Sequence, residues 1–317
     1  MPTNLIKKVQ NTVFQYNLFE RGDKIVLGVS GGPDSTAMLD IFSKLRKKYS
    51  LELIIAHVNY GLRGRDSERD EKFVREMANS YGYPFLKLGF RKILKPSFRT
   101  ENELRNIRYA FFEKIRSEKK FDYIAVAHNA DDQVETFLAR VIRGAGLLGL
   151  SAMRYKNEKI IRPLLNIPRS EILEYLKKNN LDFRVDKTNL ESKYARNIIR
   201  NDLLPYLEKK FNPAIRKTIF DATVSIAEDY ALISDLTEKE YKKLKDFDVK
   251  KIKKLHPAIQ RNLIRKVLEE KKGDLQNIGA ANIEEILKII KSTKNKAQTV
   301  VFKGLKITRK GDKIKIE

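Results

Sequence analysis

Six consecutive residues, Ser30-Gly31-Gly32-Pro33-Asp34-Ser35, have the composition of a phosphate-binding loop. Two adjacent glycines let a backbone approach a phosphate closely and adopt conformations closed to other residues. Proline suits the first position of a helix, where its missing N–H is no loss. Free amides at the start of that helix, and the positive end of its dipole, would then face the anion. The hexapeptide therefore predicts a nucleotide-phosphate site, with the serine hydroxyls as additional donors.

The aspartate of this loop, Asp34, indicates a divalent cation. A carboxylate repels a triphosphate unless a cation such as Mg²⁺ lies between them. The loop has no GK[ST] sequence, so it is not the Walker-type loop of ordinary ATPases and GTPases. The alternative is that Gly-Gly-Pro-Asp is only the turn between a strand and a helix. Serines at both ends of the loop favour phosphate binding.

A second group of polar residues, His128, Asp132 and Glu135, follows another apolar run. Asp132 and Glu135 are three residues apart, so on a helix they share one face near its N-terminal end. Carboxylates there can hold Mg²⁺, orient a cationic amine or accept its proton. The alternative is that the aspartates only cap the helix, with Asp131 as the predicted cap. Capping does not account for all three residues, so we predict a functional role for them.

Two of the three histidines stand at the ends of predicted parallel strands, which favours a functional role for His57 and His128. A histidine at a strand end can also be only a satisfied polar residue. His256 precedes a proline and is predicted to cap a helix instead.

Strands that alternate with helices are predicted to position these residues. Apolar runs predict strands at 24–30, 51–58, 84–90 and 122–128, and helical spacing predicts helices at 3–20, 35–49, 67–81, 101–119 and 131–143. This alternation implies right-handed crossovers and a parallel sheet covered on both faces, an α/β doubly wound fold. Such sheets bind ligands beyond the carboxyl ends of their strands, where both polar groups fall.

The second half of the chain is mainly helical. Helices are predicted at about 169–179, 193–209, 214–245, 256–271 and 281–291. Residues 211–213 (FNP) indicate a break, because proline and the residue before it resist helix continuation. Residues 299–317 alternate apolar and polar side chains around a Lys-Gly-Asp turn, which predicts a hairpin. We therefore expect one domain at 1–212, and at 213–317 a helical linker with a small C-terminal α+β domain.

The charge balance predicts a polyanionic partner. The chain has 65 Lys and Arg against 41 Asp and Glu, a net charge of +24. Nucleic acid attracts such a protein, because its bound counterions are released on binding. A Lys/Glu-rich surface typical of heat-loving organisms is the alternative, but it does not explain so unequal a balance. We therefore predict a nucleic-acid partner.

Composition also excludes several kinds of chemistry. The chain has no cysteine, so it has no disulfide, thiolate nucleophile, iron–sulfur cluster or Cys-bound zinc. Its apolar runs are too short to cross a bilayer, and no membrane partner is expected. The first residues do not form a signal peptide, so the expected compartment is the cytoplasm.

The loop SGGPDS resembles the SGGxDS loop of the PP-loop ATP pyrophosphatases, which cleave ATP between its α and β phosphates and adenylate a carbonyl-type oxygen. Within that superfamily, residues 24–206 resemble the tRNA(Ile)-lysidine synthases. Residues 57–63 are similar to that family's HVNHGLR segment, with Tyr60 in place of the usual histidine. Residues 127–153 match its longest block closely, and further likenesses occur at 103–109, 161–165 and 194–200. Residues after about 250 resemble its small substrate-binding domain more weakly, and the further C-terminal domain of longer members is not expected here.

The resemblance implies that the wobble cytidine of isoleucine tRNA with a CAU anticodon is converted to lysidine. ATP would adenylate the C2 carbonyl oxygen, and the ε-amine of free L-lysine would displace AMP. The expected nucleotide-binding residues are Ser30, Gly31, Gly32, Pro33, Asp34, Ser35 and His57. The expected catalytic residues are Asp34, Arg108 (with Arg105 as the alternative), His128, Asp132 and Glu135, with Asp34 and Asp132 on Mg²⁺. Candidates for the tRNA backbone are Arg63, Arg65, Arg143, Lys193, Arg196 and Arg200, any of which could otherwise be only surface charge. A homodimer is left open.

Two other functions remain open at this point. The first is an adenylating ligase for a small molecule, such as an ammonia-dependent NAD synthetase, although the basic balance and the helical second half count against it. The second is an RNA-binding protein that keeps the fold without catalysis. Enzymes with this loop that thiolate tRNA are disfavoured, because they need cysteines or an iron–sulfur cluster and the chain has no cysteine.

Overall fold

A six-stranded sheet forms the centre of the first part of the molecule. Its strands are β1 (Lys24–Gly28), β2 (Glu52–Val58), β3 (Phe85–Leu88), β4 (Tyr123–Val126), β5 (Lys156–Asn157) and β6 (Ile160–Ile161). The spatial order is β3-β2-β1-β4-β6-β5, and every neighbouring pair is parallel except β5–β6. The predicted α/β doubly wound fold is confirmed. Strand order reverses between β1 and β4, which is where ligands bind in such sheets.

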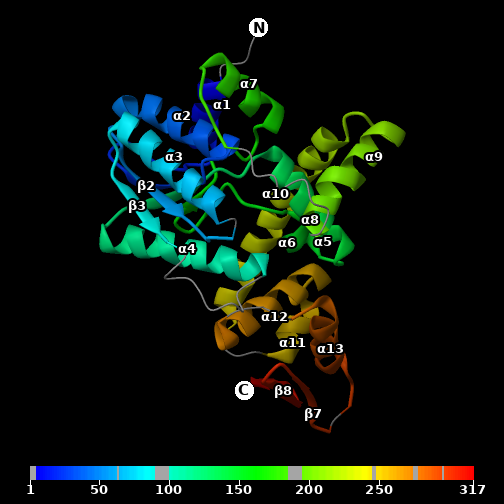
Figure 1. The fold of residues 1–317 in the computed structure, drawn as a ribbon. Helices are drawn as coiled ribbons and strands as arrows, with labels where there is room; N and C mark the ends of the chain where they lie inside the picture. The colour runs from blue at the N-terminus through cyan, green and yellow to red at the C-terminus, as the bar shows by residue number, and fades with distance from the viewer. Residues whose placement is uncertain are drawn as a thin grey trace. The chain divides into compact units, whose positions relative to one another are not determined.

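Helices cover both faces of this sheet (Figure 1). The helices of this part are α1 (Leu5–Gln15), α2 (Pro33–Tyr49), α3 (Arg65–Tyr81), α4 (Glu101–Glu118) and α7 (Arg169–Lys178). Alternate residues of β1 enter two separate cores, because successive side chains of a strand point to opposite faces. Ile25 and Leu27 pack with α1, α2, α3 and α7, whereas Val26 packs with Phe112 of α4. Both cores fix the strand ends that carry the polar residues.

The computed structural model describes residues 5–62, 64–89, 100–184, 195–244, 248–273, 278–294 and 296–317. Arg63 and Lys193, predicted to contact tRNA, lie outside these ranges. The chain divides into two compact units, Met1–Arg143 with Ala152–Asp221, and Gly144–Ser151 with Ala222–Glu317. The sequence places the domain boundary at 212, and the chain passes between the units after Asp221.

A run of helices completes the first unit and leads into the second. These are α5 (Ala130–Ile142), α8 (Ala195–Ile198), a π-helical turn (Ile199–Leu203), α9 (Leu204–Lys210) and α10 (Ile215–Lys243). Val134 of α5 packs against Ile199, Leu204 and Ile219 in a small core of its own. This core attaches the 195–210 segment to α5.

The second unit is built from short helices and a small sheet. Its elements are α6 (Leu147–Leu150), α11 (Val249–Lys254), α12 (Pro257–Lys272), α13 (Ala280–Lys291), β7 (Gln298–Phe302), β8 (Leu305–Lys310) and β9 (Lys313–Ile316). The strands form an antiparallel β7-β8-β9 sheet, so the predicted hairpin gains a third strand. His256 caps α12 by accepting a hydrogen bond from the Ala258 amide, as predicted. None of the helices within the described ranges is long and apolar enough to cross a membrane.

Candidate active site

The loop after β1 is held by the hydroxyl of Ser35. Its Oγ accepts hydrogen bonds from the amides of Ser30 and Gly31, both at 3.2 Å, and donates to the Gly32 carbonyl at 3.1 Å. Gly31 has a φ of +87°, and a Cβ there would lie 3.0 Å from Val74 Cγ2. Glycine is therefore required at this position by both conformation and space. Pro33 opens α2 as expected, so residues 30–33 form a preorganised turn at the positive end of a helix.

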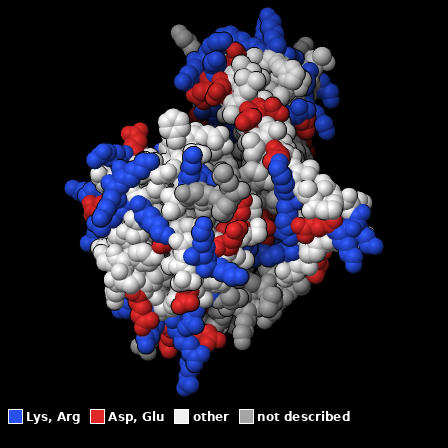
Figure 2. Space-filling model, turned by 90° about the horizontal axis from the view of Figure 1, so that it is seen from above, with Lys and Arg blue, Asp and Glu red and all other residues white. Residues whose placement is uncertain are grey.

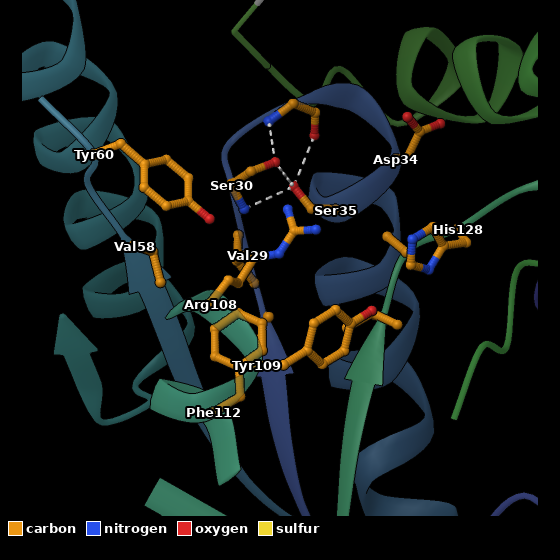
Figure 3. Close-up of a pocket in the computed structure, with 14 residues that line it drawn as sticks. Val29, Ser30, Asp34, Ser35, Val58, Tyr60, Arg108, Tyr109, Phe112 and His128 are labelled. Carbon is orange, nitrogen blue, oxygen red and sulfur yellow. Dashed lines mark hydrogen bonds between the residues drawn. The ribbon is translucent and has the colours of Figure 1, made fainter. Parts of the chain in front are cut away.

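A pocket opens beside this loop at the carboxyl ends of β1, β2 and β4 (Figure 3). Its wall combines the loop with α4 and the segment after β4, and its lining includes Ser30, Gly32, Asp34, Ser35, Tyr60, Arg108, Tyr109 and His128. Figure 3 shows the Arg108 guanidinium directed toward Ser35. The pocket thus offers the Ser30 and Ser35 hydroxyls and the Arg108 guanidinium to a polyanion.

His57 supports the loop from behind. The side chain is buried, and its Nδ1 lies 2.8 Å from the carbonyl oxygen of Val29, one residue before Ser30. Burial lowers the pKa of His57 below its usual value, so the ring is neutral and Nδ1 donates its proton to this carbonyl. The pocket lining does not include His57. His57 thus contacts the loop backbone, and its predicted contact with the nucleotide stays a prediction.

Asp34 lies between the loop and the second polar group. Its carboxylate accepts a hydrogen bond from Asn129 Nδ2 at 2.9 Å and one from Arg169 Nη1 at 3.0 Å. Burial raises the pKa of Asp34 above its usual value, and the Arg169 guanidinium and Asn129 amide offset this only in part. Burial at this position therefore disfavours the charged form of the carboxylate.

Asp132 and Glu135 form a carboxylate pair that binds two guanidinium groups. Arg196 donates from Nε to Glu135 and from Nη2 to Asp132, both at 2.8 Å. Arg200 donates to the two oxygens of Glu135 at 2.5 and 2.9 Å. The Glu135 side chain has no exposed surface, whereas the two arginines are partly exposed. Arg196 and Arg200, predicted as tRNA contacts, thus lie within the site, and their tRNA role stays a prediction.

The predicted cap of α5 is wrong. Asn129 caps the helix: its Oδ1 accepts from the Asp132 amide, and Asp132 Oδ2 accepts from the Asn129 amide, both at 3.0 Å. Asp131 instead accepts from the Arg169 amide at the start of α7 and from Arg216 Nη1. Asp132 therefore belongs both to the helix cap and to the predicted cluster of functional residues. Asn129 also donates to Asp34, so one amide side chain joins the two predicted carboxylate sites.

His128 lies in the pocket as a neutral ring. Its Nδ1 is buried without a hydrogen-bond partner within the described residues. Burial lowers the pKa of His128 well below its usual value, and the guanidinium groups of Arg162 and Arg105 lower it further. A neutral imidazole can accept or donate a hydrogen bond to a substrate without adding charge.

We expect His128→Asn to flatten the dependence of stability on acid pH. A histidine with a depressed folded pKa contributes stability that is present above the unfolded pKa of about 6.5 and lost as pH falls below it. One such group gives a slope of up to about 1.4 kcal/mol per pH unit. Urea unfolding of both proteins between pH 5 and 7 measures this slope. Subtracting one stability curve from the other removes the contribution of the carboxyls, which both proteins share. Parallel curves would show that His128 binds protons equally in the folded and the unfolded protein, which would contradict a lowered pKa.

The remaining predicted residues lie at the edge of the site or away from it. Arg65, the first residue of α3, and Arg143, which follows α5, are exposed to solvent. Arg105 does not line the pocket; its guanidinium stacks on the Tyr109 ring at 4.8 Å. Sequence reasoning missed Asn129, whose spacing to Asp132 is a capping signal, and Arg169, which is 135 residues away from Asp34. No local pattern could have identified Arg169.

Comparison with known proteins identifies the family. A family model described as the PP-loop domain matches residues 1–207. The chain is 37% identical to the tRNA(Ile)-lysidine synthase of Clostridium tetani over 97% of this chain and 68% of that protein. It is 34% identical to the enzyme of the same name from Clostridioides difficile, over 98% of this chain and 70% of that protein. The chain thus spans about two thirds of the length of these relatives.

A solved structure shares the fold. The U34-tRNA thiolase NcsA from Methanococcus maripaludis, solved with its [4Fe-4S] cluster, superposes with a TM-score of 0.57 at 23% identity, over 72% of this chain and 80% of that one. Its likeness supports the fold alone. The family model and the two lysidine synthases extend the likeness to sequence, and the chain belongs to the tRNA(Ile)-lysidine synthase family.

Proposed function

We propose that this chain ligates free L-lysine to C2 of the wobble cytidine in isoleucine tRNA with a CAU anticodon, using ATP and releasing AMP and pyrophosphate. One observation carries the proposal within the site itself. Asn129 hydrogen-bonds to Asp34 of the phosphate loop and to Asp132 of the carboxylate pair. The loop proposed to bind the nucleotide and the carboxylate pair proposed to bind a cationic amine are therefore adjacent.

In the first step, the loop positions ATP so that the cytosine C2 oxygen can attack the α-phosphorus. The bond from this phosphorus to pyrophosphate breaks as the new phosphorus–oxygen bond forms. Arg108 stabilises the negative charge that develops on the phosphates. The amides of residues 30–32 donate to the hydroxyls of Ser30 and Ser35 in this structure, so they would bind phosphate by exchanging those partners.

In the second step, the carboxylate pair holds the ε-amine of lysine. Arg196 and Arg200 bind both carboxylates in this structure, and Glu135 has no exposed surface, so the amine would take the place of one of these guanidinium groups. The ammonium first gives one proton to a carboxylate, and the resulting neutral amine attacks C2. The bond from C2 to the AMP oxygen breaks, and the nitrogen releases its second proton to water. Burial raises the pKa of Asp132, which makes it a stronger base than an exposed aspartate, and we propose that it accepts the proton of the amine.

Asp34 and Asp132 are the ligands that we propose for a magnesium ion. Both carboxylates accept a hydrogen bond from Asn129, and Mg²⁺ is commonly bound by one or two carboxylates together with substrate phosphates. No group of three or more acidic or histidine side chains suited to a metal occurs among the residues that the structure describes. The two aspartates would therefore need ATP to complete the coordination. When bound, the ion would neutralise phosphate charge during adenylation.

The basic surface supports tRNA as the partner. Figure 2 shows Lys and Arg side chains spread over one face of the molecule with fewer Asp and Glu among them. A net charge of +24 favours a polyanion over a small acid as substrate.

The test incubates the protein with ATP, Mg²⁺, labelled lysine and CAU-anticodon isoleucine tRNA. We expect label on the tRNA, together with stoichiometric AMP and pyrophosphate. Methionine tRNA, which has the same anticodon, is the control substrate. Pyrophosphate release that depends on a small acid and not on tRNA would instead identify a small-molecule ligase.

A further inference from the structure

Two aromatic side chains contact each other on the surface of the first unit. Tyr206 of α9 and Phe211, which follows that helix, have ring centroids 5.9 Å apart and an interplanar angle of 61°. They are 55% and 71% exposed, respectively. Single exposed apolar residues are ordinary, but two large rings in contact form a continuous apolar surface that water solvates poorly.

The surroundings of this aromatic pair are basic. Lys209 and Lys210 lie between the two rings in sequence, are exposed, and have no ion pair within the described part of the chain. The nearby Glu208 is neutralised by Arg216 at 2.7 Å. Aromatic faces beside unpaired cations are what a single-stranded nucleic acid needs, because its bases stack and its phosphates are anionic.

The same helical segment carries the aromatic pair and the arginines of the active site. Residues 195–210 run continuously through α8, the π-helical turn and α9. Arg200 contacts Glu135 from this segment, and Tyr206 follows six residues later. At a rise of about 1.5 Å per residue, the rings begin roughly 9 Å along the helix from Arg200. A few nucleotides of an unpaired loop span such a distance.

We propose that Tyr206 and Phe211 form a stacking platform for an unpaired RNA base that neighbours the base modified in the active site. This inference rests on the proposed function for the identity of the RNA, whereas stacking itself requires neither ATP nor lysine. It assigns the exposed rings a role in holding the anticodon loop open, so that the target cytidine can enter the pocket alone.

The absence of tryptophan from the chain allows a direct test. Phe211→Trp and Tyr206→Trp each introduce the single indole of the protein while keeping an aromatic face. The probe is an RNA hairpin with a CAU-containing seven-nucleotide loop, and a blunt RNA duplex without a loop is the comparison. We expect indole fluorescence to be quenched on hairpin binding in both variants and to change little with the duplex. The matched control is Phe14→Trp, because Phe14 is an 85% exposed aromatic on α1, and we expect no quenching there.

A second measurement gives the contribution to binding. Phe211→Ala should weaken hairpin binding roughly 5- to 100-fold, since stacking of one base on an aromatic ring has this effect, while Phe14→Ala should not. Hairpin binding without quenching at positions 206 and 211, or equal quenching by the duplex, would overturn the proposal. A wild-type dimer that Phe211→Ala converts to a monomer with unchanged RNA affinity would identify a protein interface instead. Lysine transfer by the wild-type protein is independent of these outcomes, so failure of the platform and failure of the proposed function are distinguishable.

Discussion

Glu135→Gln is expected to lower lysine transfer to tRNA by roughly 10²- to 10⁴-fold, because Glu135 holds the amine that Asp132 deprotonates and loss of such a proton transfer has an effect of this size. The side chain has no exposed surface and receives three hydrogen bonds from Arg196 and Arg200. Glutamine keeps the shape but not the charge, so the amine loses its anionic partner. Adenylation of tRNA in the absence of lysine should persist, because Glu135 does not line the nucleotide pocket. The measurement is lysine incorporation beside lysine-independent transfer of labelled AMP to tRNA.

The matched control is Glu171→Gln. Glu171 also forms a salt bridge, with Lys8 at 2.7 Å, but it lies on α7 away from the pocket. We expect this variant to retain lysine transfer within about threefold, since a partly exposed ion pair contributes little to stability. Loss of both partial reactions in Glu135→Gln, with a lowered melting temperature, would mean that the residue serves only to hold the two arginines.

Asp34→Asn is expected to reduce tRNA-dependent pyrophosphate release by at least about 100-fold, as is typical when charge stabilisation at a reacting group is removed. The variant should fold as well as the wild type. Burial raises the pKa of Asp34, so its charged form is disfavoured in the folded protein, and the stability cost grows as pH rises through that pKa. A neutral isostere avoids this cost at neutral pH. Thermal unfolding at pH 7 and the pyrophosphate assay measure the two effects.

The control for this prediction is Asp40→Asn, which makes the same substitution on the same helix but outside the pocket. Asp40 is buried and accepts hydrogen bonds from Tyr81 and Tyr175, but it does not line the pocket. We expect Asp40→Asn to lose some stability and keep pyrophosphate release. Wild-type pyrophosphate release by Asp34→Asn would show that the loop carboxylate has no part in adenylation.

The parallel sheet could be predicted because its signals are local. β1, β2 and β4 are short apolar runs, and each appears within a few residues of its expected position. The two-residue strands β5 and β6 could not be predicted, since so short a pair depends on its neighbour β4 rather than on its own pattern. The extra strand of the small sheet was also missed. The predicted turn at 310–312 is the one between β8 and β9, whereas the turn between Phe302 and Leu305, which separates β7 from β8, was not recognised.

Some residues of the candidate site could be predicted from local sequence patterns, and others could not. The loop at 30–35 and the spacing of Asp132 and Glu135 are visible in sequence, because each group lies within one turn or one helix. Partners that come from distant segments are not visible. Arg169 reaches Asp34 from α7, and Arg196 reaches Asp132 from α8, so charge partners had to come from the fold. Arg196 therefore looked like surface charge in the sequence.

The π-helical turn at Ile199–Leu203 changes the direction in which the later side chains of its segment point. A wider turn holds one residue more than an α-helical turn, so everything after it is rotated by about 100° relative to a regular helix. That rotation sets the angular offset between the side of the segment that carries Arg196 and the side that carries Tyr206. Deleting one residue here would restore regular α-helical winding and keep both Arg196 and Tyr206. The angle between these two side chains about the helix axis would then differ from the present one.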